Sequence, residues 1–376
     1  MIPVNEPYLG KEELKNIKDC VRSGWISSKG AYIEKFEKAF SDFCGMRYGV
    51  ATTNGTTAIH LALAALGVGK GDEVIVPTFT MIATAYAVAY TGAKPVFVDC
   101  EEETWNMDVS KVAKLVNSRT KALLPVHIYG HPVDMDPLLD IAKKRKLYVV
   151  EDAAEAHGAE YKGKRCGSFG HVNCFSFYAN KIITTGEGGM VVTNDKKLSE
   201  RLNLLKDLAH SPKKRFLHTD LAFNYRMTNM QAAIGFAQMQ RAGRLVEKKR
   251  RIARLYKKYL KDIEGIRLPA EMPWAKNVYW MYSVLVEDDF GISRDELMKR
   301  LAKEGVGTRA FFVPMHVQPI FKRSGAVDKK KKYPVADYIS KRGLYLPTGM
   351  TLTEKQIVEV CDKVRKVQKK TRKSRR

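Results

Sequence analysis

The chain has 376 residues, 45% of them hydrophobic, and a formal net charge of +24; this length suits a large and a smaller globular core better than a single one. It contains no run of 18 or more uninterrupted apolar residues, and residues 1–10 lack the basic-then-apolar order of a secretory signal, so we expect a cytoplasmic protein that does not span a membrane. The six cysteines are scattered without the close pairs typical of zinc sites or disulfide frameworks, so we expect free thiols and no metal site.

Short β-rich apolar runs alternate with helix-length segments through the first two-thirds of the chain. Strands separated by helices in this way predict an α/β fold with a mostly parallel seven-stranded sheet and helices on both of its faces. The expected strands are residues 48–52, 73–77, 94–99, 122–127, 147–152, 172–178 and 189–194, and the expected helices include 56–66, 81–90, 136–146 and 196–209.

The pattern changes near residue 244 and predicts a second, smaller domain. A long basic helix at 244–261 is followed by a strand at 280–287 and by helices at 294–304 and 353–367. Two or three strands with helices on one side make a small α+β domain. We therefore predict a large domain, a small C-terminal domain and a basic tail, at residues 1–243, 244–362 and 363–376.

Much of the excess positive charge lies in the lysine run at 329–332, in the helix at 244–261 and in the acid-free end of the chain from residue 363. Runs of this kind are usually solvated faces or disordered ends, so we predict a disordered tail and expect no nucleic-acid or membrane partner. Attraction of an anionic, diphosphate-bearing substrate is a further use of this charge. A basic nucleic-acid-binding regulatory protein remains the alternative of another class.

Three features suggest a ligand site beyond the carboxyl ends of the strands, where sheets of this kind bind their ligands. Asp152 ends the apolar run LYVVED, where it can pair with a protonated pyridine nitrogen or, alternatively, cap a helix. Lys181 lies between an apolar strand and a glycine-rich hairpin, so desolvation should lower the pKa of its amine. Gly55 and Thr56 begin a helix after a strand, which suits a phosphate, although Thr56 could be a plain N-cap.

The strings NGTTAIHLAL, EDAAEAHGAEYKGKRCGSFG, CFSFYANKIITTGEGGMVVTND and FNYRMTNMQAAIG resemble the DegT/DnrJ/EryC1/StrS family of sugar aminotransferases, which are fold-type I pyridoxal-phosphate (PLP) enzymes. The resemblance extends over essentially the whole chain up to the basic tail. It implies PLP as the cofactor, with pyridoxamine phosphate as its aminated form, and a homodimer whose active sites are shared between the two chains.

Carried over residue by residue, the resemblance implies that Lys181 is the catalytic residue that carries the cofactor and that Asp152 holds the pyridine nitrogen. In a related dehydratase branch the cofactor lysine is replaced by histidine, so a lysine at position 181 favours amine transfer. The implied phosphate ligands are Gly55, Thr56 and Ser176 from the same chain and Asn224 from the neighbouring one.

Three positions depart from the family pattern. Glu155 stands where many relatives have glutamine, near the cofactor's phenolic oxygen. A carboxylate beside a phenolate implies either that the two share a proton or that the contact is shifted. Met81 stands where an aromatic ring often stacks on the pyridine, and a thioether covers a ring less rigidly. Ala179 replaces a glycine before the Asn-Lys pair, which is a small change.

The resemblance also implies a nucleotide-linked keto sugar as substrate and L-glutamate as amino donor. It is strongest for the branch that aminates carbon 4 of GDP-4-keto-6-deoxymannose, with UDP- or dTDP-linked keto sugars as alternatives. Basic side chains suit a diphosphate because they form charge-assisted hydrogen bonds to its oxygens. The candidate substrate residues, each of which could equally have an ordinary loop or surface role, are Trp25, Ser27, Lys213, Arg215, His218, Arg309 and His316.

Overall fold

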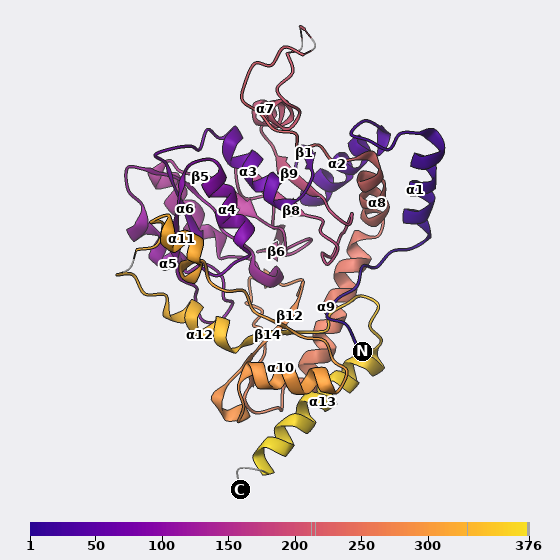
Figure 1. Ribbon diagram of the computed structural model, residues 1–376, viewed down its shortest axis with the longest axis vertical. Helices are drawn as coiled ribbons and strands as arrows, with labels where there is room; N and C mark the ends of the chain where they lie inside the picture. Colours follow the sequence, from indigo (N-terminus) through magenta and orange to yellow (C-terminus); the bar gives the residue numbers. More distant parts are fainter. Residues whose placement is uncertain (212, 215, 329, 374–376) are drawn as a thin grey trace.

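The main sheet of the computed structural model, which describes residues 1–211, 213–214, 216–328 and 330–373, has seven strands in the order β1-β9-β8-β5-β4-β2-β3 (Figure 1). Neighbouring strands are parallel except where β9 pairs with β1 and β8, which confirms the predicted α/β sheet. The elements of this larger part are β1 (Tyr48–Thr52), β2 (Glu73–Pro77), β3 (Lys94–Val98), β4 (Thr120–Leu123), β5 (Tyr148–Asp152), β8 (Val172–Ser176), β9 (Gly189–Thr193), α1 (Lys11–Ser23), α2 (Ala31–Cys44), α3 (Gly55–Ala65), α4 (Ile82–Tyr90), α5 (Val109–Val112), α6 (Met135–Arg145), α7 (Lys196–Lys206) and α8 (Asn229–Met239).

Both faces of the sheet are covered by helices. Successive residues of each strand point to opposite faces, so neighbouring residues of one strand are buried on different sides. In β2, Val74 and Val76 belong to the apolar cluster that contains residues of α3 and α4. Ile75, between them, belongs to the cluster that contains residues of α5 and α6. Uninterrupted apolar strands are therefore what this architecture requires.

The expected strand at 122–127 is wrong in its boundaries, since β4 spans Thr120–Leu123. Pro125 has no N–H group and cannot donate to a neighbouring strand. Its carbonyl instead accepts the N–H of Asp152 at 2.9 Å. The chain thus follows β5 beyond the end of β4 and places Val126 at the carboxyl edge of the sheet, next to the candidate site.

The smaller part contains an antiparallel sheet in the order β10-β12-β14-β13. It has four strands rather than the two or three expected, because the two edge strands have two residues each and leave no alternating pattern in the sequence. Its elements, with the short ones that link it to the larger part, are α9 (Ala242–Leu260), β10 (Ile266–Arg267), β12 (Tyr282–Val286), α10 (Arg294–Lys303), β13 (Arg309–Ala310), α11 (Pro319–Arg323), α12 (Pro334–Arg342), β14 (Gly343–Leu346), α13 (Glu354–Lys373), β6 (Glu160–Tyr161), β7 (Lys164–Arg165) and β11 (Ala275–Lys276).

The two faces of this small sheet pack against different partners. Val284 and Leu344 belong to an apolar cluster with residues of α9, α10 and α13. Leu285 and Tyr345, on the opposite face, belong to the core of the larger part. The N-terminal Ile2 also belongs to the small cluster, and the predicted boundary after residue 243 falls in the first turn of α9, so the division into domains remains a prediction.

The prediction of a disordered tail from residue 363 is wrong for residues 363–373, which continue α13. Val364 and Val367 are buried in the small cluster. Gln368 donates a hydrogen bond to the carbonyl of Glu264 at 2.5 Å, and Lys363 donates one to the carbonyl of Glu304 at 2.6 Å. Apolar residues at helical spacing anchor this helix, and its basic residues occupy the remaining face. Residues 374–376 lie outside the described residues.

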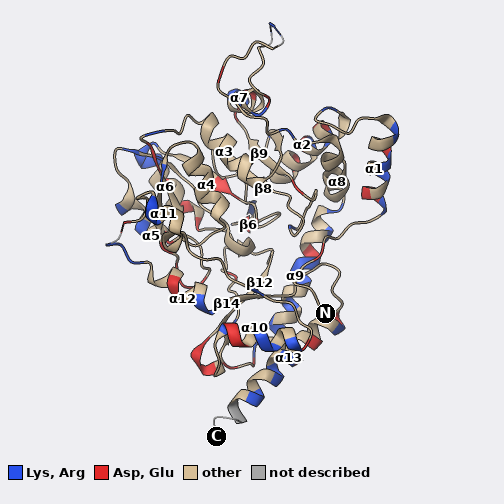
Figure 2. Cartoon of the chain, in the orientation of Figure 1, with Lys and Arg blue, Asp and Glu red and all other residues tan. Residues whose placement is uncertain are grey.

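Lysine and arginine residues are spread along α9, α10 and α13 toward the lower end of the molecule and along α1 (Figure 2). Acidic residues lie among them, as in the ion pairs Arg300–Glu296 and Lys366–Glu304. Within the described ranges no helix is long and apolar enough to cross a membrane.

Candidate active site

A cavity of ≈ 500 Å³ opens at the carboxyl ends of β2, β4, β5 and β8, beside the first turn of α3. It brings together every residue predicted to bind the cofactor except Asn224, and one of the predicted substrate residues, Arg309. The cavity is lined by Asn54, Gly55, Thr56, Ile59, Thr80, Met81, Ala83, Thr84, Val126, Asp152, Ala154, Glu155, Ser176, Tyr178, Asn180, Lys181, Glu187, Trp280, Arg309, Phe312 and Tyr345.

One end of the cavity is the N-terminus of α3. Asn54, not Thr56, is the N-cap, because its side chain accepts the N–H of Thr57 at 2.9 Å. In the described part of the chain the N–H groups of Gly55 and Thr56 have no acceptor. A Cβ on Gly55 would lie 2.7 Å from the Cβ of Ser176, so glycine is needed for the close approach of α3 to β8. Free N–H groups, a helix dipole and a nearby hydroxyl make a seat for a phosphate.

Asp152 lies at the end of β5, with its carboxylate directed into the cavity. Its Oδ2 accepts the hydroxyl of Thr84 at 2.7 Å, and its Oδ1 accepts the N–H of Ala154 at 3.1 Å. The helix-cap alternative is wrong, because no helix begins after Asp152. Burial raises the pKa of Asp152, whereas the hydrogen bonds from Thr84 and Ala154 and the charge of Lys181 lower it. A protonated nitrogen at this place would complete the pairing of the carboxylate.

Lys181 projects into the cavity, and only a tenth of its side chain is exposed. Its Nζ lies 3.9 Å from Oε1 of Glu155 and 3.7 Å from the centre of the Trp280 ring. Burial lowers the pKa of Lys181, and the carboxylates of Glu155 and Asp152 oppose that shift. A buried amine with a lowered pKa is available as a nucleophile and as a proton carrier.

Glu155 is fixed between a strained turn and the lysine. Its Oε2 accepts the N–H of Tyr129 at 2.7 Å. Tyr129 has a positive φ of 54°, which is uncommon for a residue with a side chain and directs its N–H toward the carboxylate. Burial raises the pKa of Glu155, and the charge of Lys181 opposes this shift. The carboxylate and the amine thus form a buried ion pair, with 3.9 Å between Oε1 of Glu155 and Nζ of Lys181.

These residues fit PLP. The cavity provides an anion seat at the start of α3, a buried carboxylate at the end of β5 and a buried amine. Oδ1 of Asn180, which is buried, has no hydrogen-bond partner within the described residues and leaves an acceptor for a bound group. Such a set at the carboxyl edge of an α/β sheet is that of a fold-type I PLP enzyme.

Comparison with known proteins agrees with this class. A model of the DegT/DnrJ/EryC1/StrS aminotransferase family matches residues 7–365, and the chain belongs to that family. GDP-perosamine synthase from Escherichia coli O157:H7 is 44% identical over 363 residues, which are 96% of this chain and 97% of that protein. GDP-perosamine synthase from Caulobacter vibrioides is 44% identical over 360 residues, 96% of each chain.

Among solved structures, the chain is similar to the PLP-form of a sugar aminotransferase, Spr1654 from Streptococcus pneumoniae. The TM-score is 0.92 and the identity 26%, with 98% of this chain and 99% of that one covered. The chain is thus a PLP-dependent aminotransferase. The alternative of a nucleic-acid-binding regulator finds no support in these comparisons.

Several predicted residues lie away from this cavity in the same chain. His316 is buried, with Nδ1 2.8 Å from the hydroxyl of Thr78 and Nε2 3.0 Å from Asp337, so it is held between the two parts of the fold. Arg215 lies outside the described residues. Those exposed on the surface are Trp25, Ser27, Lys213, His218 and Asn224.

Sequence reasoning missed part of the wall of the cavity. Trp280, Phe312 and Tyr345 come from the smaller part of the fold. Each lies at least 99 residues after Lys181 in the chain and has an ordinary apolar sequence neighbourhood. Tyr178 and Asn180 could have been found, since both come just before Lys181 in the same turn.

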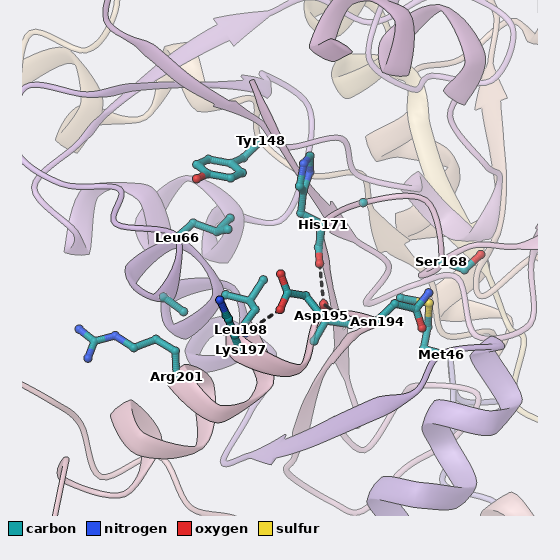
Figure 3. A pocket seen from close by; sticks show the side chains of 13 residues that line it. Met46, Leu66, Tyr148, Ser168, His171, Asn194, Asp195, Lys197, Leu198 and Arg201 are labelled. Atoms are coloured by element: carbon teal, nitrogen blue, oxygen red, sulfur yellow. Dashed lines mark hydrogen bonds between the residues drawn. The ribbon is translucent and has the colours of Figure 1, made fainter. Parts of the chain in front are cut away.

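Another cavity, of ≈ 470 Å³, lies at the opposite edge of the sheet (Figure 3). The side chains of Tyr148 and His171 lie at the amino ends of β5 and β8, and the hydroxyl of Thr193 donates to the carbonyl of His171 at 2.8 Å. Nδ1 of His171 accepts the N–H of Val149 at 3.1 Å, and Arg201 pairs with Asp220 at 2.9 Å. These groups hold the sheet edge together, and none of the predicted site residues that the structure describes lines this cavity.

Proposed function

We propose that the protein transfers an amino group from L-glutamate to carbon 4 of GDP-4-keto-6-deoxymannose and so forms GDP-perosamine. The observation that carries this proposal is that Asp152, Lys181 and the Gly55–Thr56 seat share one cavity in a chain that is 44% identical to two GDP-perosamine synthases. We also propose that the reaction takes place in the cytoplasm.

The roles of the residues follow from their places in the cavity. PLP, when bound, supplies an electron sink that stabilises negative charge on the substrate carbon. Gly55, Thr56 and Ser176 bind the phosphate, and Asp152 keeps the pyridine nitrogen protonated. Lys181 would carry the cofactor, and its amine would take a proton from the substrate carbon and return it.

Two further side chains in the lining complete the proposed roles. Glu155 receives a proton from the amine of Lys181 or from the phenolic oxygen of the cofactor, since its carboxylate has only the N–H of Tyr129 as a hydrogen-bond donor within the described residues. Met81, which is 49% exposed at the cavity wall, covers one face of the pyridine ring.

We propose that the active site is shared between two chains. Asn229, at the start of α8, donates hydrogen bonds to the carbonyls of Trp25 and Ser27, each at 2.6 Å. These bonds hold the exposed 25–27 loop beside the segment that carries the exposed Asn224. Lys213 and His218 lie on a segment that projects beyond α7 (Figure 1). These exposed groups serve the nucleotide sugar and cofactor phosphate in the cavity of the partner subunit.

Mixing two inactive variants should regenerate activity if Asn224 serves the partner. Lys181→Ala chains keep Asn224, and Asn224→Asp chains keep Lys181, so one of the two sites in a mixed dimer is intact. Equal mixing should restore up to about a quarter of the wild-type turnover in a symmetric dimer. The measurement is turnover after subunit exchange, with Lys181→Ala chains alone as the control. No recovery despite demonstrated exchange would mean that each site is built within a single chain.

The substrate is tested by comparing kcat/KM for GDP-, UDP- and dTDP-linked 4-keto-6-deoxy sugars, with L-glutamate as donor. We expect the GDP substrate to be preferred by about 100-fold or more, because a pocket that hydrogen-bonds one base leaves buried polar groups unpaired with another. A preference for the UDP or dTDP substrate would reject the perosamine assignment and leave the aminotransferase class intact. Failure with all three would direct the search to keto groups at carbon 3.

A further inference from the structure

Trp280 forms a wall of the cavity directly against the proposed catalytic lysine. Its ring centre is 3.7 Å from Nζ of Lys181, and its side chain is almost completely buried. The indole N–H donates to the carbonyl of Asn180 at 2.8 Å, which ties the ring to the residue before Lys181. The position of this ring therefore decides what surrounds the amine on one side.

The backbone of Trp280 is held from behind by a buried lysine of α9. Nζ of Lys249 donates to the carbonyl of Trp280 at 2.8 Å and to the carbonyl of Thr348 at 2.7 Å. The N–H of Thr348 donates to the carbonyl of Val4 at 2.8 Å. One amine thus joins α9, the segment before β12 and the segment after β14, and the last of these holds the N-terminal segment.

Lys249 is unusual because its side chain is fully buried and, within the described residues, pairs with no carboxylate. Burying an amine without a counter-charge is costly, so an apolar side chain of similar length would suit packing alone better. Burial lowers the pKa of Lys249 to about 7. Both its protonated and its neutral form have enough N–H groups for the two carbonyls.

We propose that Lys249 is a positioning residue that acts on Lys181 by fixing Trp280 over its amine. The inference rests on the proposed role of Lys181 as the cofactor lysine. The face of an indole ring attracts a cation, so a fixed Trp280 stabilises the protonated state of the Lys181 nitrogen. The other charged or titratable groups that face Lys181 are Asp152, Glu155 and His157, and none of them contacts Lys249.

The test is a spectroscopic pH titration of the PLP-loaded protein, because the absorption of PLP joined to Lys181 changes when the shared nitrogen loses its proton. Lys249→Met keeps the length of the side chain and removes both N–H donors. We expect the midpoint of the titration to fall by about half a pH unit or more, since the contact with the ring favours the protonated state. Lys257→Met, a change at an exposed position on the same helix, should leave the midpoint unchanged.

A second variant keeps the inference testable if Lys249→Met does not fold, which thermal unfolding of each variant will show. Trp280→Phe retains the backbone carbonyl and loses the indole, so it should lower the midpoint in the same direction. Where both single variants fold, their effects should be non-additive in the double variant, because they act through one contact.

The outcomes separate this inference from the proposed function. An unchanged or raised midpoint in Lys249→Met, or in Trp280→Phe if only that variant folds, overturns the role of Lys249, as do additive effects. If the wild-type protein shows no absorption band that disappears in Lys181→Ala, the proposed role of Lys181 fails instead.

Discussion

Replacement of Lys181 by alanine is expected to reduce turnover by roughly 10³-fold or more, because it removes the proposed proton carrier and the covalent attachment of the cofactor. In the structure no other lysine lines the cavity, so among the described residues no second amine is in place to substitute. The absorption band of lysine-bound PLP should disappear, while the phosphate seat at Gly55 and Thr56 can still bind the cofactor non-covalently. Absorption spectra and turnover with L-glutamate and the keto sugar measure both effects.

Two controls distinguish loss of chemistry from loss of structure in Lys181→Ala. Lys257→Ala changes an exposed lysine and should retain wild-type turnover and absorption. The space left by the truncated side chain opens into a cavity of ≈ 500 Å³, so added methylamine should restore part of the turnover by supplying a proton acceptor. Wild-type turnover in Lys181→Ala would rule out Lys181 as the lysine that carries the cofactor.

The framework of the fold was predictable because both faces of the large sheet are buried. Each of its strands is a short apolar run, and residues such as Val74 and Ile75 enter different clusters on the two sides. The misplaced end of β4 has a local cause, the missing N–H of Pro125. The last helix was predicted as far as residue 367 because Val360, Val364 and Val367 follow helical spacing, but the positive charge of the segment from residue 363 led us to expect a disordered tail where α13 continues to residue 373.

The residues at the chemical centre of the site were predictable from the sequence, whereas part of the cavity wall was not. Asp152 and Gly55 follow strands whose carboxyl ends meet at one edge, so topology alone places them together. Trp280 reaches the same cavity through the packing of the small sheet on the large one, and contacts of this range leave no periodic pattern in a sequence. The role of Asn224 came from the resemblance to sugar aminotransferases. Its side chain is exposed and does not line the cavity of its own chain, so one chain alone gives no reason to expect a role for it.

Asp152→Asn is expected to lower kcat by about 10³-fold with the fold retained, a loss of about 4 kcal/mol of transition-state stabilisation. Asparagine has nearly the same shape as aspartate, and its amide oxygen can still accept the hydroxyl of Thr84, now 2.7 Å from Oδ2. It carries no negative charge, however, so the pyridine nitrogen loses the partner that keeps it protonated. The measurement is kcat with L-glutamate and the keto sugar, alongside the thermal unfolding temperature.

Thr84→Val is the matched control for Asp152→Asn, because it removes the hydroxyl that orients the carboxylate and leaves the negative charge in place. Loss of one hydrogen bond to a charged group costs about 1.5–3 kcal/mol, so turnover should fall by about 10- to 100-fold, less than in Asp152→Asn. The two variants thus separate the charge of Asp152 from its orientation. Near-normal turnover in Asp152→Asn would mean that a different acid faces the pyridine nitrogen, and Glu155, the other carboxylate buried in the cavity, would then be the residue to replace.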